Sequence, residues 1–434
     1  MEYNDFLSDA KGNYKKLPEE KSELYKKNYI HIPEEYVEFI DFESNANYGA
    51  SDEFAIRSYE KGVAERMGIR FDLVVGSNFV SVPKNMHIEI LEAGSMEKEF
   101  FDNKLFKSVD DKFAALINAK TEKIIRIKLG EGEKENFNIM FVNTSRQLFS
   151  QVICEVAEGA ELNLFEWHGS DAQRSSVQGI INETKIEEMA KMNLVVLHNE
   201  NENTAVLDMH RGTVKSHGSL VQHFAYIGGR ITRARGSVDL NGSGAHTDNA
   251  EIVLGTLDQK MDICTDIVNA AKGSLALLDS KAVLSDTSRC ILKGFASIKD
   301  GAIASRSFVH ERGLLLDNTA KIDSIPGMSV DEYDVKATHS SATAPIDEES
   351  LFYLSSRGMN KTQANLLLVD GFLGSNITKI KDTRLVYAIS SILHDKVINK
   401  KCGIVPELSK EIMLIETGNE EDGERLLEEH YKYR

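Results

Sequence analysis

The residue whose surroundings best suit chemistry is His339, which follows Asp334-Val335-Lys336 and two small residues, and precedes Ser340 and Ser341. A neutral imidazole can bind iron or another transition metal. It can equally form hydrogen bonds that hold together the junction between two structural units. The residues alone leave both interpretations open.

Other histidines offer weaker patterns. His210, His217 and His223 are separated by seven and six positions, which fits neither a His-Glu-x-x-His motif nor one face of a strand. Asp208 and His210 do share a strand face, but a surface pair explains them equally well. The pair at 167–168, Trp-His, is typical of a strand end. These residues therefore predict ordinary structure and no metal site.

Motifs for nucleotides and for serine hydrolases are lacking. The segment GSGAHT at 242–247 lacks the third glycine of Gly-x-Gly-x-x-Gly, and the sequence contains neither Gly-x-x-x-x-Gly-Lys-Ser/Thr nor Gly-x-Ser-x-Gly. We expect a turn between strands there, and no nucleotide bound by this chain. The cysteines, at positions 154, 264, 290 and 402, form no Cys-x-x-Cys pair and are expected to be small buried residues.

The composition is that of a globular protein, with 41% hydrophobic and 27% charged residues among 434. A formal net charge of −17 argues against nucleic-acid and anionic-membrane partners, which require basic patches. The apolar run at 366–369 is far too short to span a membrane, and the first residues lack the apolar stretch of a secretory signal. These features predict a cytoplasmic protein.

The elements that position these residues change type along the chain. Residues 1–75 have helical spacing, whereas from 76 to 340 short runs of Val, Ile, Leu and Phe alternate with turn residues. No proline lies between Pro83 and Pro326, which suits long paired ladders, and a coarse repeat in 273–324 places alanines at turns. This pattern favours a parallel β-helix over a β-sandwich.

Helices are expected to replace the strands after Pro345, so that 341–434 forms a C-terminal helical region. Asp347 is suited to cap a helix that ends at Gly358, and Asn360 with Gln363 forms a capping-box pattern for a second helix. A third helix is predicted over 383–399, and a last one in the acidic tail at 418–434.

The segment from Asp334 to Phe372, DVKATHSSATAPIDEESLFYLSSRGMNKTQANLLLVDGF, resembles the C-terminal signature of the SufB/SufD family of iron–sulfur cluster assembly scaffolds. VLSDTSRCILKGFASI, at 283–298, and the segment at 314–330 are also similar. The resemblance implies a right-handed parallel β-helix core flanked by α-helical segments. It further implies a C-terminal helix pair that docks an ABC-type ATPase called SufC.

The same resemblance implies that such chains pair through the end of the β-helix, as a SufB–SufD heterodimer or a homodimer, and that a transient cluster forms at that interface with sulfur from a donor protein. On this basis His339 is the proposed cluster ligand. The expected ATPase-docking residues are Leu351, Phe352, Tyr353, Leu354, Arg357 and Gly358 on one helix, with Ala364 and Phe372 on the next.

The chain departs from the family pattern at several positions. Ile322 stands where SufB-type members have an essential cysteine, Thr338 and Ser340 stand in place of carboxylates beside the histidine, and Ala337 replaces a cysteine frequent in SufD-type members. The chain is therefore closer to SufD, or to an undivided SufB/SufD-like protein. Because thiolates are the usual cluster ligands, Cys264 and Cys290 are secondary candidates.

The sequence thus predicts a non-enzymatic scaffold subunit. Two alternatives stay open at this point. One is a β-helical enzyme that acts on a polymeric substrate through a groove lined with charged residues. The other is a purely structural partner of a cluster-bearing sister subunit, which the isoleucine at position 322 favours.

Overall fold

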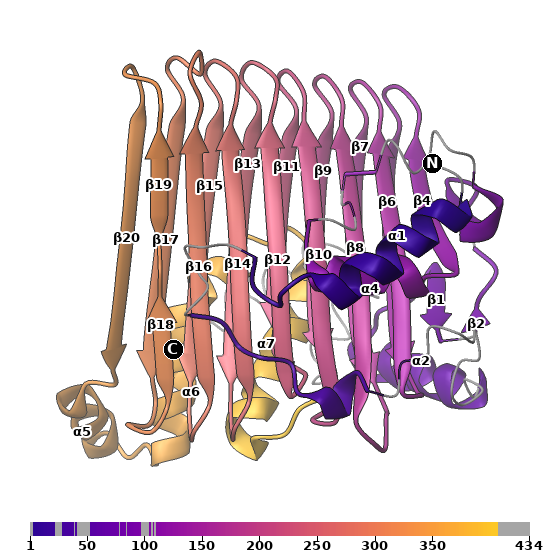
Figure 1. Cartoon of the computed structure of the whole chain (residues 1–434). Coiled ribbons are helices and arrows are strands. Elements are labelled where there is room, and N and C mark those ends of the chain that lie inside the picture. The colour runs from indigo at the N-terminus through magenta and orange to yellow at the C-terminus, as the bar shows by residue number, and fades with distance from the viewer. Residues whose placement is uncertain are drawn as a thin grey trace, which may run out of the picture.

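The computed structural model describes residues 3–21, 28–38, 40, 53–77, 79–83, 85–96, 104–105, 107 and 110–406. Two sheets of ten strands face each other and form a solenoid, because from residue 123 to 324 the chain crosses to the other sheet after each strand (Figure 1). Each turn of the solenoid is called a coil. Nearly all neighbouring strands within each sheet are parallel, which confirms the predicted mainly β architecture with a parallel β-helix core. We refer to the two layers as the first and second sheets.

The first sheet has its strands in the order β2, β1, β5, β7, β9, β11, β13, β15, β17, β20. Their bounds are β1 Leu73–Gly76, β2 Phe79–Val80, β5 Lys134–Asn143, β7 Glu161–Ser170, β9 Lys191–Asn199, β11 Ser219–Tyr226, β13 His246–Gly255, β15 Leu275–Leu284, β17 Arg306–Leu315 and β20 Lys336–Pro345.

The second sheet runs from β18 through β16, β14, β12, β10, β8, β6 and β4 to β3, with β19 also paired to β16. Its strands are β3 Ile88–Glu92, β4 Lys123–Leu129, β6 Gln147–Val156, β8 Ser176–Ile186, β10 Thr204–Val214, β12 Ile231–Leu240, β14 Lys260–Asn269, β16 Arg289–Ile298, β18 Lys321–Ser324 and β19 Gly327–Val330.

The turns between the sheets stack in register like the strands. Many of these turns contain a residue in a left-handed conformation, for example Gly244 with φ +67° and Ala304 with φ +60°. The N–H of such a residue donates to the next coil, as Gly244 N does to Lys272 O at 2.9 Å. The predicted turn at GSGAHT is confirmed, and glycine or alanine occupies several of these positions, although Met189 and Leu257 adopt the same conformation in other turns.

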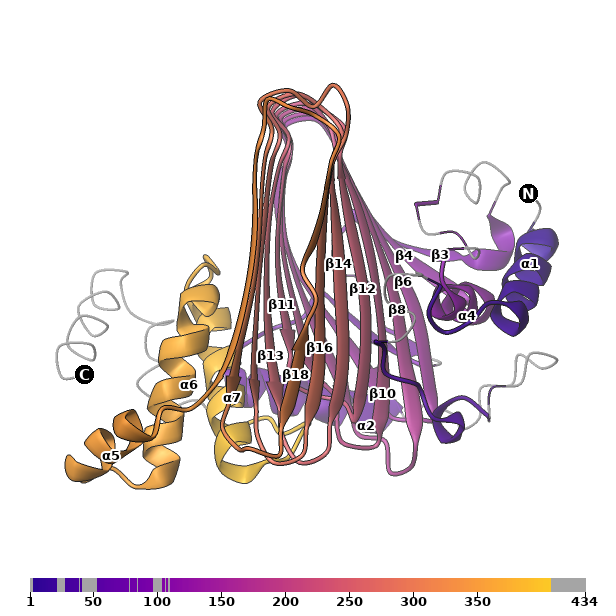
Figure 2. The ribbon, with the colours of Figure 1, turned by 60° about the vertical axis from the view of Figure 1, so that its left-hand side comes forward.

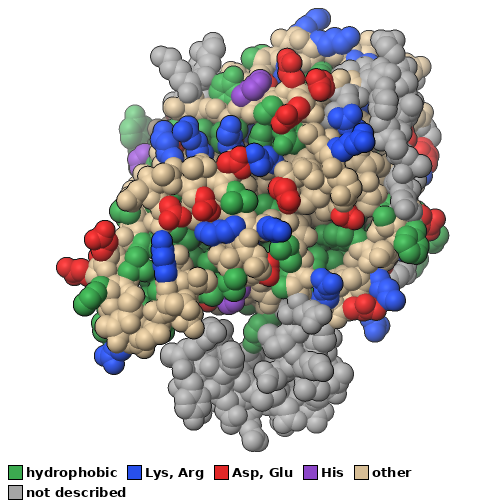
Figure 3. All heavy atoms as spheres, turned by 90° about the horizontal axis from the view of Figure 1, so that it is seen from below, with side chains coloured by type: hydrophobic (Ala, Val, Ile, Leu, Met, Phe, Trp, Pro, Cys, Tyr) green, Lys and Arg blue, Asp and Glu red, His purple; other side chains and the backbone are tan. Residues whose placement is uncertain are grey.

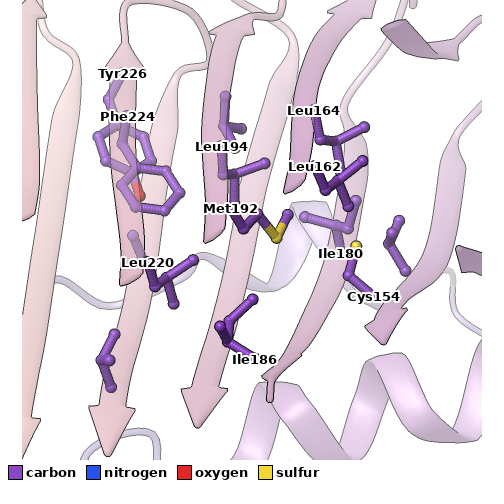
Figure 4. Packing of buried hydrophobic residues seen from close by; sticks show 14 of the residues in the cluster. Cys154, Leu162, Leu164, Ile180, Ile186, Met192, Leu194, Leu220, Phe224 and Tyr226 are labelled. Carbon is purple, nitrogen blue, oxygen red and sulfur yellow. The ribbon is translucent and has the colours of Figure 1, made fainter. Parts of the chain in front are cut away.

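Apolar side chains from both sheets fill the space between them. Leu194, Phe224 and Tyr226 of the first sheet meet Ile180 and Ile186 of the second (Figure 4). Parallel strands place the same kind of side chain one above another, so the core continues along the whole stack. Burial of this apolar area provides the main driving force for folding, at about 25 cal/mol per Å².

Helices cover the outer faces of both sheets (Figure 2). α6 (Lys361–Ile377) and α7 (Thr383–Asn399) pack on the first sheet, through Leu373, Ile389 and their neighbours. α1 (Tyr3–Lys16) packs on α4 (Lys112–Lys120), which covers the second sheet. The remaining elements are η1 (Glu34–Tyr36), α2 (Glu53–Met67), η2 (Ala93–Ser95) and α5 (Glu348–Ser356).

The C-terminal helices begin and end as their capping residues predict. The Asp347 carboxylate accepts from the N–H groups of Glu349 and Ser350 at the start of α5, and Gly358 has φ +89° after its end. Asn360 and Gln363 form the capping box of α6. The helix expected in the acidic tail lies outside the described residues, and none of the described helices is long and apolar enough to cross a membrane.

Candidate functional site at the open end of the solenoid

The C-terminal end of the coil exposes the edges of both sheets. β20 is the last strand of the first sheet and lies at the outer left of the molecule in Figure 1. β18 and β19 end the second sheet. Within the described residues no further strand pairs with β20, so half of its backbone N–H and C=O groups face outward without a ladder partner.

His339 occupies the middle of this edge strand. It pairs in register with Val309 of β17, whose side chain is fully buried between the sheets. Because parallel strands in register place equivalent side chains on the same side, the His339 side chain belongs to the interior-facing row of the last coil. It is nevertheless exposed, because no later strand in the described part of the chain covers it.

The two neighbours of His339 lie in the opposite row. Thr338 and Ser340 alternate with His339 along β20, and the Ser340 hydroxyl lies 2.7 Å from Nδ1 of His310 on the outer side of the coil. The positions at which the family resemblance implies carboxylates are thus directed away from the row that contains the imidazole.

A buried carboxylate lies one coil behind the open end. Glu311 pairs with Ser341, two residues from His339, and is fully buried. Burial raises the pKa of Glu311 to about 8, although the Ser324 hydroxyl partly counteracts the shift. The end of the coil therefore holds an acid that can titrate near neutral pH, next to the row that contains the exposed imidazole.

Cysteine side chains are not brought to this surface. Ile322, in the last coil, pairs in register with Cys290 of β16, so the Cys290 thiol lies one layer inside, where burial raises its pKa. Cys264 lies on the outer side of the second sheet, beside Arg235 and Asp266. The structure thus places Cys290 near the open end but beneath an isoleucine, and places Cys264 elsewhere.

The helix that follows β20 has an unusually exposed apolar surface. α5 buries none of its residues against the rest of the described chain, and Phe352 and Tyr353 are 76% and 56% exposed. Arg357 lies over the Tyr353 ring, 5.2 Å from its centroid, while Leu351 and Leu354 are half-buried. In Figure 1, α5 lies below the end of β20, at the corner of the molecule.

The two predicted docking residues on α6 have different surroundings. Ala364 is fully buried, and Phe372 packs against the apolar cluster on the first sheet. Lys281 of that sheet donates to the Phe372 carbonyl oxygen at 2.8 Å and lies over its ring. These residues hold α6 on the body, so α5 alone carries the freely exposed part of the predicted docking set.

Sequence reasoning missed a buried polar cluster in the middle of the coil. Glu166, His168, His198, Asp208 and His210 all project between the two sheets and are at most 5% exposed. The interpretation of Asp208 and His210 as a surface pair was wrong. They do share a strand face, as the sequence indicated, but that face is the interior one, because both pair in register with interior residues on either side.

Hydrogen bonds connect this cluster. His198 lies between Glu200 and Asp208, with Nδ1 2.8 Å from Glu200 Oε1 and Nε2 3.1 Å from Asp208 Oδ2. Burial alone would lower the pKa of His198, but the two carboxylates raise it to about 10. Burial lowers the pKa of His168 to about 3 and raises that of Glu166 to about 7.

The other two histidines of the sequence pattern lie apart from this cluster. His217 lies in a turn with φ 55°, and His223 belongs to a pocket on the outer side of the first sheet, lined also by α6 and α7. They therefore share no site with His210. On the face of the molecule seen in Figure 3, acidic and basic side chains of the described residues are interspersed with apolar ones.

Comparison with known proteins gives a consistent result. Residues 140–372 match the model of a family described as "SUF system FeS cluster assembly, SufBD core domain". Similar proteins include the iron–sulfur cluster assembly protein SufD of Bacillus subtilis, with 24% identity over 58% of this chain and 58% of that protein. A SufBD family protein of Staphylococcus saprophyticus is 24% identical over 67% of this chain and 63% of its own length. One of Staphylococcus epidermidis is 24% identical over 77% of this chain and 78% of that protein.

Proposed function

The chain belongs to the SufB/SufD family of iron–sulfur cluster assembly proteins, and from this membership we propose that it is a scaffold subunit that docks an ABC-type ATPase, SufC, through α5. The open end of its coil would pair with a second SufB/SufD-like chain, either a sister subunit or another copy. A nascent cluster, built with sulfur from a donor protein, is the cargo of that interface.

The exposed aromatic surface of α5 carries this proposal. Phe352 and Tyr353 lie next to each other on a helix that has no buried residue, which is costly for an isolated protein. Exposed aromatic residues with an adjacent arginine are typical of interface hot spots. Because only a two-residue connection separates β20 from α5, a partner that moves α5 also moves the edge strand that carries His339.

A second candidate is favoured by the lack of thiolates at the open end. Ile322 occupies the end of the coil and covers Cys290, so His339 is the strongest metal donor that the described interior-facing row exposes there. If a sister chain supplies the thiolates, this chain acts chiefly as its structural partner. In both versions His339 faces the interface.

Binding of the ATPase tests the docking proposal. The variant Phe352→Ala/Tyr353→Ala should weaken binding of the ATPase in titration calorimetry by at least ~100-fold, as loss of two hot-spot residues at about 2 kcal/mol each implies. Circular dichroism should stay unchanged, because α5 contributes nothing to the core. Phe54→Ala, which removes another exposed aromatic residue on α2, is the matched control. Unchanged binding by the double variant contradicts the proposal.

Anaerobic reconstitution separates the scaffold from the structural partner. Wild-type chain and His339→Ala are incubated with iron, sulfide and the ATPase, and visible absorption of bound cluster is recorded. Absorption that the variant loses supports His339 as a ligand. Absorption that appears only after a sister chain is added, and does not depend on His339, supports the structural role.

A further inference from the structure

The polar cluster between the two sheets combines several imidazoles and carboxylates, whereas the open end exposes a single imidazole in its described interior-facing row. Three imidazoles, from His168, His198 and His210, lie among the carboxylates of Glu166, Glu200 and Asp208. The carboxylates are fully buried, and taking them out of water costs several kcal/mol each unless a cation or a proton compensates. Asparagine, glutamine and tyrosine side chains, which are neutral, complete the surroundings.

Three carboxylate oxygens of the cluster lack a hydrogen-bond partner, one of them Oδ1 of Asp208, which lies 3.3 Å from Nδ1 of His210. Glu200 uses Oε1 to contact His198, whereas its Oε2 has none, and Oε1 of Glu166 likewise has none. Each belongs to a side chain with 0% exposure. Unsatisfied buried acceptors are rare, and a cation bound to Glu200 would satisfy the charge and the free oxygen of that side chain.

Three of these side chains are close enough to share one ion. One ligand atom from each of His168, His198 and Glu200 lies within 4.8 Å of the other two. Two imidazoles with one carboxylate form a donor set that suits iron(II), zinc(II) and cobalt(II). The spacing is wider than the ~3.4 Å between ligands on a tetrahedral ion, because the His168 and His198 rings are stacked at 4.6 Å between centroids.

The neighbours of both imidazoles are arranged as in metal sites. Nε2 of His198 faces Asp208 at 3.1 Å, and Nε2 of His168 faces Glu166 at the same distance. A carboxylate on one ring nitrogen orients a metal-bound histidine and leaves the other nitrogen for the ion. Here that leaves Nδ1 of His198, now 2.8 Å from Glu200, and Nδ1 of His168, now 3.2 Å from the amide of Gln178.

From this geometry we propose that the interior of the coil holds one divalent first-row transition-metal ion, bound by Nδ1 of His168, Nδ1 of His198 and the Glu200 carboxylate. Binding displaces the proton shared by His198 and Glu200, which leaves to solvent, and draws together the three ligand atoms, which now lie within 4.8 Å of one another. The site is separate from the open end and would be filled whether or not the chain docks an ATPase.

Metal content of the whole protein tests this inference. The chain is expressed in minimal medium with cobalt(II), and in parallel with zinc(II) or, anaerobically, iron(II), then dialysed against EDTA. A buried ion exchanges slowly, so we expect about one ion per chain after dialysis, measured by mass spectrometry of the metal, and visible d–d absorption in the cobalt sample. Less than ~0.1 ion per wild-type chain, or an ion that EDTA removes, overturns the inference.

Variants locate the ion. Glu200→Gln keeps the size of the side chain and should lower the retained metal at least tenfold, as should His198→Asn. His339→Ala, at the open end, and His246→Gln, on the outer side of the first sheet, should retain one ion. Equal retention by the interior variants and wild type overturns the inference. If the interior variants fail to fold, the wild-type measurement still decides it, and loss in His339→Ala would place the ion at the open end instead.

Discussion

The two ends of the solenoid are built differently. At the N-terminal end the second sheet finishes with the short antiparallel strand β3, and Ile88 of β3 and Ile127 of β4 pair in register and are almost fully buried. The first sheet finishes with β2, a strand of two residues. At the other end β20 presents ten residues along an uncovered edge.

Short final strands protect a sheet from pairing with another chain, whereas a long uncovered edge invites it. β20 is rich in alanine, serine and threonine, and its charged and proline residues, Lys336 and Pro345, lie at its two ends. The apolar side chain of Ile322 is only partly buried there. The N-terminal end is thus capped by short strands of the chain itself, whereas the C-terminal end leaves open the edge at which the proposed partner would bind.

The largest expected effect is loss of pairing at the open end. Thr343→Arg places a charge in the interior-facing row of β20, opposite the neutral Gly313, where a partner would bury it. The uncompensated desolvation costs about 3 kcal/mol or more, so the dissociation constant should rise at least ~100-fold. Sedimentation of the chain alone, and calorimetry with a sister chain, measure this.

The control for that experiment is a matched charge at the capped end. Met86→Arg alters a side chain that is 89% exposed next to β3, and should leave association unchanged. If both variants weaken association equally, or if neither does, the two ends do not differ in the way proposed.

A smaller effect is expected on stability. Ile127→Ala removes a fully buried side chain at the capped end and should cost about 3 kcal/mol in the free energy of unfolding. Ile322→Ala at the open end should cost about 1 kcal/mol, because its side chain already contacts water. Thermal unfolding of the two variants compares these costs. Saturation with a partner chain should increase the cost of Ile322→Ala and leave that of Ile127→Ala unchanged. Equal costs in the absence of a partner would mean that the open end is as well packed as the capped one.

Local features of the chain were predictable from sequence. The caps at Asp347 and Asn360 use interactions between residues two or three positions apart, and the strands end at Pro345. The parallel β-helix was predictable as a fold class, because a region without proline and with small residues at turns suits stacked coils. Once β20 is known to be a strand, the alternation of its side chains places His339 in the interior-facing row.

The interior cluster was not predictable in the same way. The strands that carry His168 and Asp208 are buried on both faces, because helices and loops cover the outside, so hydrophobic alternation does not reveal which side is the interior. The packing of the N-terminal segment on the second sheet was equally unpredictable, because it depends on contacts between residues more than two hundred positions apart. Ile30 N donates to Asp262, and Glu20 pairs with Arg235.

The smallest effect concerns the pH dependence of stability near the open end. Burial raises the pKa of Glu311 to about 8 in the folded chain, from about 4.5 when unfolded, so the folded state holds this proton more tightly. Stability from this group is therefore complete below pH ~4.5 and is lost as the pH rises through ~8. Glu311→Gln lacks a titrating proton and should be more stable than wild type at pH 9 by about 1–2 kcal/mol, allowing for water at the open end.

Glu158→Gln, on an exposed turn, is the control. Thermal unfolding from pH 5 to 9 should show a flatter profile for Glu311→Gln alone. If a partner covers the open end, adding it should move the wild-type loss to higher pH, because deeper burial favours the neutral acid; an unmoved profile would mean that the partner binds elsewhere.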